Sequence, residues 1–218
     1  MLRYRIKINV AKSEFFQKEV TFLGHVIDTN GIKKSPEFIE RIRTYPKPKT
    51  VTELRQFLGL CNFQRKFIKN CSTISKPLSE KTTGPKRKLI EWTPEMHKSF
   101  DELKNQLIAD VQLSFPDYSE DAQLLEVFAD ASSKGVGAFI GQQQGETYKT
   151  IAYASTTFSP AQVRYSTLEK ELCALRFAVK TFRPFLLGVK FVLYTDHRPL
   201  AISTEYGIRK LSTNKNDK

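Results

Sequence analysis

The chain is poor in the residues that build disulfide-bonded scaffolds and zinc sites. Its 218 residues include three cysteines and three histidines, at scattered positions and without a Cys-x-x-Cys pair. This pattern does not make a zinc site and is typical of a protein from a reducing compartment. The sequence also lacks a run of about eighteen apolar residues and an apolar stretch near its start. We therefore expect no membrane span, no secretion, and an intracellular location that is cytoplasmic or nuclear.

The positive charge of the chain is concentrated in its first half. The net charge is +12, and residues 33–88 alone hold 15 basic and 4 acidic side chains. Residues 110–218 are close to neutral, with 13 basic and 12 acidic side chains. A basic part joined to a near-neutral part favours a division of labour, in which one part holds a polyanion and the other acts on it. A solvated basic surface without a partner is the alternative.

Three carboxylates in the second half are candidates for a metal site. Asp130 ends the run Val-Phe-Ala-Asp, Asp196 ends the run Leu-Tyr-Thr-Asp, and Glu171 lies between them in Leu-Glu-Lys-Glu-Leu. The two aspartate runs are apolar and β-prone, whereas the segment around Glu171 has a helical pattern. Two aspartates at strand ends and one helical glutamate are ligands that can hold two Mg²⁺ ions against a phosphodiester.

The second half predicts a mixed α/β fold with the element order β-β-β-α-β. We expect a helix with flanking turns within 160–187 and strands at 124–130, 135–140, 149–155 and 190–195. A strand that follows a helical crossover usually returns parallel to an earlier strand. If the last strand lies beside the first, Asp130 and Asp196 meet at the same end of adjacent strands, whose backbones are about 5 Å apart.

The expected helix contains two glutamates, and its pattern favours Glu171 as the ligand. Its apolar residues share one face, which we expect to be buried against the sheet: Leu168, Leu172, Leu175, Val179, Phe182 and Leu186. At about 100° per residue, Glu171 lies roughly 60° from the centre of this face and Glu169 roughly 100° away on the other side. We therefore expect Glu171 at the edge of the buried face and Glu169 in solvent.

Gly135, Gly137 and Gly141 could be mistaken for a nucleotide-binding loop. They follow the first expected strand but open no helix, so the dinucleotide pattern lacks its structural context. We interpret them as part of a strand that passes close to the metal site.

The first half predicts β-structure followed by helices. Residues 4–32 read as β-structure: Tyr4, Ile6 and Ile8 alternate with polar residues, the segment 20–27 is β-branched and aromatic, and 28–31 is a turn signal. A short helix at 35–45, capped by Ser35, precedes a longer helix at 50–69. Residues 82–88 read as a loop, and Thr93 caps a further helix with Trp92 packed under it.

The helix at 50–69 carries a polar and basic face that suits a nucleic-acid backbone. The residues of this face are Arg55, Gln56, Gly59, Asn62, Arg65, Lys66 and Lys69. Gly59 would permit close approach of such a backbone, but it would equally permit tight packing of a neighbouring helix.

Together, the motifs of the second half resemble the ribonuclease H domain of retrotransposon and retrovirus-like polyproteins. The residues that carry the resemblance are Asp130-Ala-Ser, Gly135-Val-Gly137-Ala, Tyr165 with Glu169-Lys-Glu171-Leu, Phe185-Leu-Leu-Gly188 and Thr195-Asp196-His197. The resemblance implies that Asp130, Glu171 and Asp196 are catalytic metal ligands, with His197 as a secondary candidate.

The first half is similar to the reverse transcriptase of Ty3/gypsy-type elements. The segment Phe22-Leu23-Gly24-His25 resembles the hairpin at the end of the palm that grips the primer, and residues 54–68 resemble the thumb helix that follows the duplex. Ile74, Pro77, Leu78 and Trp92 resemble the connection that comes next. The implied parts are a palm end at 1–48, a thumb at 49–80, a connection at 81–120 and a ribonuclease H-like domain at 121–218.

This resemblance implies two-metal hydrolysis of the RNA strand of RNA:DNA hybrids, with Mg²⁺ as the cofactor and Mn²⁺ as a substitute. The palm-end hairpin and the polar face of the thumb would contact the hybrid or another duplex nucleic acid. The remainder of a Pol polyprotein or a partner subunit is the implied protein partner, and a virus-like particle is an implied location.

The chain departs from the family pattern in two respects. It lacks the polymerase aspartates, which include a Tyr-x-Asp-Asp hairpin, so we do not expect polymerisation by this chain alone. The fourth ribonuclease H carboxylate of the family would lie beyond residue 218, with the last strand and helix, and Asp217 lies in a polar tail. We therefore expect weak or Mn²⁺-favoured cleavage. The alternatives are a catalytically inactive nucleic-acid-binding remnant and an unrelated α/β domain with structural carboxylates.

Overall fold

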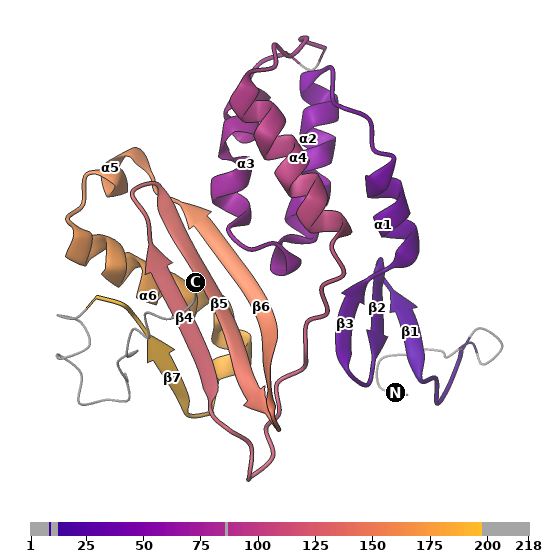
Figure 1. Ribbon diagram of the computed structural model, residues 1–218, viewed down its shortest axis with the longest axis vertical. Helices are drawn as coiled ribbons and strands as arrows, with labels where there is room; N and C mark the ends of the chain where they lie inside the picture. Colours follow the sequence, from indigo (N-terminus) through magenta and orange to yellow (C-terminus); the bar gives the residue numbers. More distant parts are fainter. Residues whose placement is uncertain (1–8, 10–12, 86, 198–218) are drawn as a thin grey trace.

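The computed structural model describes residues 9, 13–85 and 87–197 of the 218-residue chain. In this part the elements are, in chain order, β1 (Glu19–Phe22), β2 (His25–Asp28), β3 (Gly31–Lys34), α1 (Pro36–Arg43), α2 (Val51–Phe63), η3 (Arg65–Phe67), α3 (Cys71–Ser79), η4 (Glu80–Thr82), α4 (Pro94–Ile108), β4 (Leu125–Ala131), β5 (Gly135–Gln144), β6 (Thr147–Thr157), α5 (Pro160–Val163), α6 (Thr167–Leu186) and β7 (Phe191–Tyr194) (Figure 1). The strand expected around Tyr4, Ile6 and Ile8 and the tail around Asp217 lie outside the described residues.

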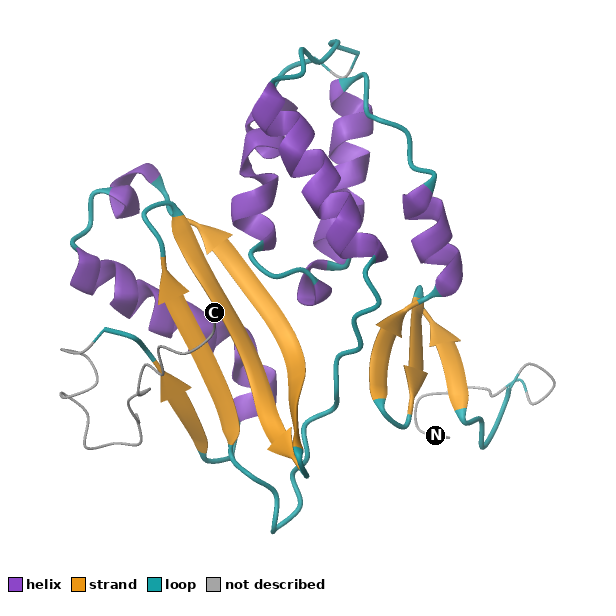
Figure 2. Ribbon diagram, viewed as in Figure 1, coloured by secondary structure: helices purple, strands orange, loops and turns teal. Residues whose placement is uncertain are grey.

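The first sheet is a meander of β1, β2 and β3, drawn apart from the second sheet in Figure 2. The β-structure expected around residues 20–27 is confirmed, and the chain turns back within this segment at Leu23 and Gly24. Both residues have positive φ, 49° and 73°, which is the backbone that a two-residue hairpin turn requires. Glycine at the second position makes this turn accessible despite the β-branched and aromatic residues around it.

Helices α1, α2, α3 and α4 share one hydrophobic core, whose fully buried members include Leu54, Phe57 and Leu103. Ser35 caps α1 and Thr93 caps α4, each by accepting a backbone N–H, as expected. The Trp92 indole donates to the Pro48 carbonyl at 2.9 Å and its ring contacts Phe100. These contacts confirm that Trp92 packs under α4.

The long helix that we expected over 50–69 is wrong beyond Phe63. Helix α2 ends there and a short 3-10 turn, η3, follows. Asn70 then adopts a left-handed backbone with φ 55°, which no helix can include, and α3 starts immediately after it. The apolar spacing continued through this break because η3 also faces the core, where Phe67 and Ile68 are buried.

The second sheet confirms the expected β-β-β-α-β order. Its strands lie in the order β6-β5-β4-β7, and β7 pairs parallel to β4 after the crossover through α6. Helix α6 covers one face of this sheet, and the core lies between them.

The face of α6 that meets the sheet is not the one that we expected. Leu168 and Leu172 are 41% and 48% exposed, whereas Ala174 and Ala178 are fully buried. Small side chains let a helix approach a sheet closely, so the alanines fix the contact and rotate the leucines of the first turns outward. Leu175, Phe182 and Leu186 are buried as expected.

We refer to the elements from α1 to α4 as the helical part. Through η3 and α3 it contacts the second sheet along the outer edge of β6. Arg65 donates to the Ser155 carbonyl at 2.5 Å, and the Ser72 hydroxyl donates to the same carbonyl at 2.7 Å. The Ser72 backbone N–H donates to the Ser155 hydroxyl at 2.9 Å. These bonds bring the start of α3 beside the second sheet. Across the described residues, no helix is both long and apolar enough for a membrane span.

Candidate metal centre

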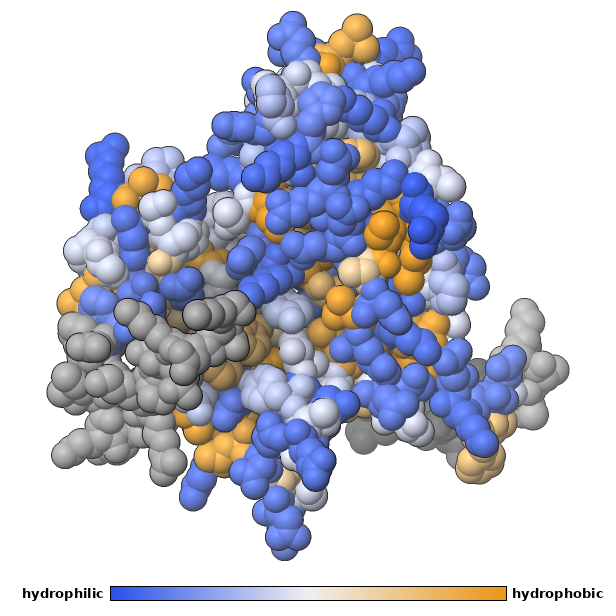
Figure 3. All heavy atoms as spheres, in the orientation of Figure 1, coloured by the Kyte–Doolittle hydropathy of each residue, from blue (hydrophilic) through white to orange (hydrophobic). Residues whose placement is uncertain are grey.

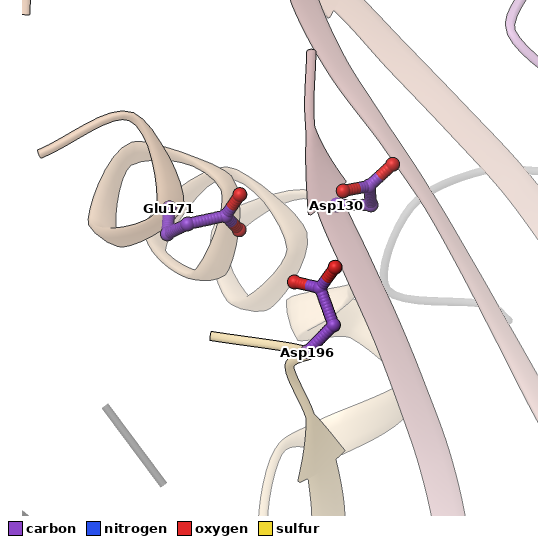
Figure 4. A group of neighbouring side chains, drawn as sticks. All are labelled: Asp130, Glu171 and Asp196. Atoms are coloured by element: carbon purple, nitrogen blue, oxygen red, sulfur yellow. The ribbon is translucent and has the colours of Figure 1, made fainter. Parts of the chain in front are cut away.

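The fold brings the three predicted carboxylates together. Asp130 lies near the end of β4, Asp196 follows β7, and Glu171 lies in the second turn of α6. One carboxylate oxygen from each residue lies within 4.8 Å of the others. The carboxylates point toward one another in Figure 4. The parallel pairing of β4 with β7 puts the two aspartates at the same end of the sheet, and α6 crosses close enough to supply the glutamate.

Burial and mutual repulsion make this cluster electrostatically unfavourable by itself. Glu171 is 4% exposed, and this burial, with the charges of Asp196 and then Asp130, raises its pKa to about 7. Burial and then the charge of Asp196 also raise the pKa of Asp130. The Ala131 backbone N–H opposes both shifts. One buried oxygen of Glu171 has no hydrogen-bond partner among the described residues. A divalent cation would offset this repulsion and use the unpartnered oxygen.

The two glutamates of α6 have opposite environments. Glu169 is exposed and accepts hydrogen bonds from the backbone N–H and the hydroxyl of Ser166, both at 2.8 Å, in a capping box. These bonds lower the pKa of Glu169. Its exposure agrees with the helix wheel, whereas Glu171 is more deeply buried than an edge position because the helix face is rotated.

His197 lies next to Asp196 but outside the carboxylate cluster. Its backbone N–H donates to the Thr195 hydroxyl at 3.2 Å. The group of potential ligands found in the described residues consists of the two aspartates and Glu171. A role for His197 therefore stays a prediction.

A cavity of about 260 Å³ opens beside the two aspartates. Its walls are Lys69, Asn70, Phe128, Ala129, Asp130, Gly137, Ala138, Phe139, Tyr153, Tyr194, Thr195 and Asp196. Gly137 lies in β5 and pairs with Asp130 of β4, which agrees with our interpretation of the glycines. Sequence reasoning missed Asn70, although asparagine is one of the residues that adopt a left-handed backbone more often than most.

The exposed side of α2 carries four of the predicted nucleic-acid-binding residues: Arg55, Gln56, Gly59 and Asn62. A Cβ atom at Gly59 would have nothing within 4 Å, so the alternative that this glycine permits tight helix packing is wrong. The Arg55 guanidinium donates to the Thr82 carbonyl at 2.6 Å. Hydrophilic residues dominate much of the surface over the helices in Figure 3.

The remaining three residues of the predicted basic face lie in different environments. Arg65 is bonded to Ser155 in the second sheet. Lys66 is half-buried over the Phe67 ring, 5.3 Å from its centroid, and burial lowers its pKa. Lys69 is exposed and lines the cavity beside the carboxylates. The break after α2 therefore divides what the sequence presented as one face.

The hairpin between β1 and β2 joins the surface formed by the end of α2. Phe22 and Leu23 are 59% and 68% exposed at its tip, beside the turn residue Gly24. His25 stacks on Phe67 and its Nε2 atom lies 3.0 Å from the Gln64 amide oxygen. Burial is the main cause that lowers the pKa of His25, and the charge of Lys66 lowers it further. The hairpin is therefore held against the end of α2 and η3 by ring contacts of His25 with Phe63 and Phe67.

Residues 92–193 match the family described as the RNase H-like domain found in reverse transcriptase. Over 197 residues, 90% of this chain, the sequence is 37% identical to the retrovirus-related Pol polyprotein from transposon 412 of Drosophila melanogaster, of which it covers 16%. It is 31% identical to the Pol polyprotein from transposon gypsy of the same species, covering 91% of this chain and 20% of the relative. The transposon Tf2-3 polyprotein of Schizosaccharomyces pombe is 36% identical over 88% of this chain and 14% of the relative. The chain thus spans a fifth or less of these relatives.

Solved structures agree with the sequence comparison. The foamy viral protease-reverse transcriptase in complex with an RNA/DNA hybrid matches with a TM-score of 0.71 and 32% identity, over 85% of this chain and 25% of that protein. A foamy viral protease-reverse transcriptase in complex with double-stranded DNA matches with a TM-score of 0.70 and 30% identity, over 90% of this chain and 34% of that protein.

Proposed function

This chain is homologous to the Pol polyproteins of gypsy-type and Tf2 retrotransposons and carries an RNase H-like domain of reverse transcriptase, and we propose that it hydrolyses the RNA strand of RNA:DNA hybrids. The single observation that supports the reaction most is the cluster of three carboxylates whose oxygens lie within 4.8 Å of one another. The hybrid is the substrate class because a foamy viral relative of known structure is complexed with one.

The chain's own residues supply the ligands for this reaction. Two Mg²⁺ ions, or Mn²⁺ in their place, would activate the attacking water and stabilise the leaving oxygen when bound. Asp130 would hold the ions from the inner strand β4. Glu171 and Asp196 would each hold one ion or orient the water. Their clustered charge selects a dication, because a monovalent ion would leave most of the repulsion uncompensated.

The helical part would hold the duplex through its backbone. Arg55, Gln56, Gly59 and Asn62 are exposed on one side of α2, and residues 33–88 carry 15 basic and 4 acidic side chains. Contacts of this kind position a duplex and carry no sequence information. Selection of a hybrid would come from its shape and from the 2′-hydroxyl groups. The hairpin tip at Phe22 and Leu23 would contact the same duplex.

A second candidate function is hybrid binding without cleavage. The described residues place three carboxylates in the cluster, and the resemblance implies a fourth. The remainder of a Pol polyprotein or a partner subunit would supply that ligand in an active assembly. Binding that depends on salt but produces no cleavage would favour this candidate.

The test is cleavage of a labelled RNA:DNA hybrid with Mg²⁺ or Mn²⁺ by the wild-type chain, Asp130→Asn and Asp101→Asn. Asp101 is an exposed aspartate of α4, so its variant makes the same chemical change away from the cluster. The proposal predicts cleavage by the wild type and by Asp101→Asn, and none by Asp130→Asn. Cleavage that survives in Asp130→Asn would assign the activity to something other than this site.

A further inference from the structure

The turn at Lys69 and Asn70 lies directly over the strand pair that carries Asp130. Asn70 has φ 55° and is the residue before α3. A Cβ atom at Gly137 would lie 2.5 Å from the Asn70 amide oxygen, so the carboxamide rests on this glycine. Gly137 is in turn the cross-strand partner of Asp130. Asn70 of the helical part therefore contacts the residue that pairs with Asp130 of the candidate metal centre.

Three hydrogen bonds fix this turn on the sheet. Arg65 precedes the turn and Ser72 follows it, and both are bonded to Ser155 of β6. Ser155 is 1% exposed, so water does not compete for these bonds. The segment between the two anchors is short, which limits the positions that Lys69 and Asn70 can occupy.

The turn forms one wall of the cavity of about 260 Å³ beside the aspartates. Its opposite wall is apolar: the Phe128 ring stacks between those of Phe139 and Tyr194, with centroids 4.5 Å from each. Its volume lies just below the range of about 300–1,000 Å³ for small-molecule sites, so it could hold part of one nucleotide and not a longer segment. It thus combines a cation, a carboxamide and an apolar wall next to the carboxylates.

We propose that Lys69 and Asn70 form a nucleotide subsite, in which the Lys69 ammonium pairs with one backbone phosphate of the hybrid and the Asn70 carboxamide hydrogen-bonds the adjoining sugar or base. The subsite rests on the proposed function, because it would hold the strand beside the same carboxylates. The rings give apolar contact to the nucleotide. Lys69 and Asn70 are positioning residues, since the chemistry stays with the carboxylates.

The test compares Lys69→Ala and Asn70→Gly with Lys180→Ala in the full chain. Glycine keeps the left-handed backbone at position 70 and removes only the carboxamide. Lys180 is exposed on α6 and lines a different cavity. Hybrid binding is measured by fluorescence anisotropy in EDTA over a range of salt concentrations, with hybrids that carry one uncharged methylphosphonate at successive positions. Cleavage is measured separately with Mn²⁺.

The subsite predicts that Lys69→Ala binds the hybrid several-fold more weakly and reduces the salt slope by about 0.9, the contribution of one phosphate contact. One methylphosphonate position should weaken binding of the wild type and leave Lys69→Ala unaffected. Asn70→Gly should slow cleavage more than Lys180→Ala. These results would support the subsite even if the wild type cleaved nothing, in which case the proposed reaction alone would fail. If both variants bind and cleave like Lys180→Ala while Asp130→Asn is inactive, the subsite is wrong and the nuclease stands.

Discussion

Replacing Glu171 by glutamine should stabilise the metal-free protein above neutral pH. Glu171 is 4% exposed, faces two aspartates and keeps one oxygen without a hydrogen-bond partner among the described residues. Its ionised form is therefore disfavoured in the folded state. Glutamine has nearly the same shape and carries no charge, so it removes the repulsion and keeps the packing of α6.

The size of the effect follows from the pKa of Glu171, which rises from 4.5 to about 7 on folding. Below pH 4.5 the carboxyl is protonated in both states and contributes no difference. Between these values the unfolded state ionises first, so the stability of the wild type falls as the pH rises. Above pH 7 the loss levels off at about 3 kcal/mol, at 1.36 kcal/mol per pKa unit. For a protein of this length the melting temperature should rise by roughly 6–12 °C in Glu171→Gln.

The assay is thermal unfolding in EDTA at pH 4.5 and pH 8, with Glu169→Gln as the matched control two residues away. The capping bonds lower the pKa of Glu169, so its variant should be slightly less stable at pH 8. Addition of Mg²⁺ should stabilise the wild type and leave Glu171→Gln unchanged. A Glu171→Gln variant that is equally destabilised at both pH values would refute the electrostatic reasoning.

Three further substitutions test separate parts of the structure. Gly59→Ala should stabilise the protein by about 1 kcal/mol in a denaturant titration, because alanine favours a helix interior and its Cβ meets no atom within 4 Å. The same variant should bind the hybrid more weakly in an anisotropy titration. Unchanged binding would show that Gly59 does not contact the hybrid. Gly135→Ala should cost about 3 kcal/mol or more, since its Cβ would collide with the backbone of Thr156; wild-type stability in urea would contradict the strand geometry. Arg65→Ala should lower the free energy of unfolding by about 1–2 kcal/mol through loss of the bond to Ser155, and a reduced salt slope of hybrid binding would instead show a phosphate contact.

The parts of the fold with local signals were predictable from the sequence. Strand-length apolar runs at Asp130 and Asp196 and the helical pattern around Glu171 indicated the element order and the three carboxylates that the fold brings together. Serine and threonine caps at Ser35 and Thr93 marked helix starts that the structure confirms. These signals depend on residues close in the chain, and here they agree with the tertiary fold.

The errors arose where tertiary contacts decide between local alternatives. The break at Asn70 is invisible in the apolar spacing because buried residues continue through it. The orientation of α6 depends on Ala174 and Ala178, whose small size matters only once a sheet lies opposite. Because we centred the buried face on the leucines and not on the alanines, the predicted face is rotated from the observed one. The burial of Glu171 is for this reason greater than predicted.

The most direct test of the central claim is Mn²⁺ binding, measured by electron paramagnetic resonance of free Mn²⁺ during titration of the wild type, Asp130→Asn and Asp101→Asn. The carboxylate cluster predicts saturable binding by the wild type and Asp101→Asn, weakened at least tenfold in Asp130→Asn, as expected for the loss of a carboxylate ligand. Equal Mn²⁺ binding by all three proteins would contradict a metal centre at Asp130, Glu171 and Asp196.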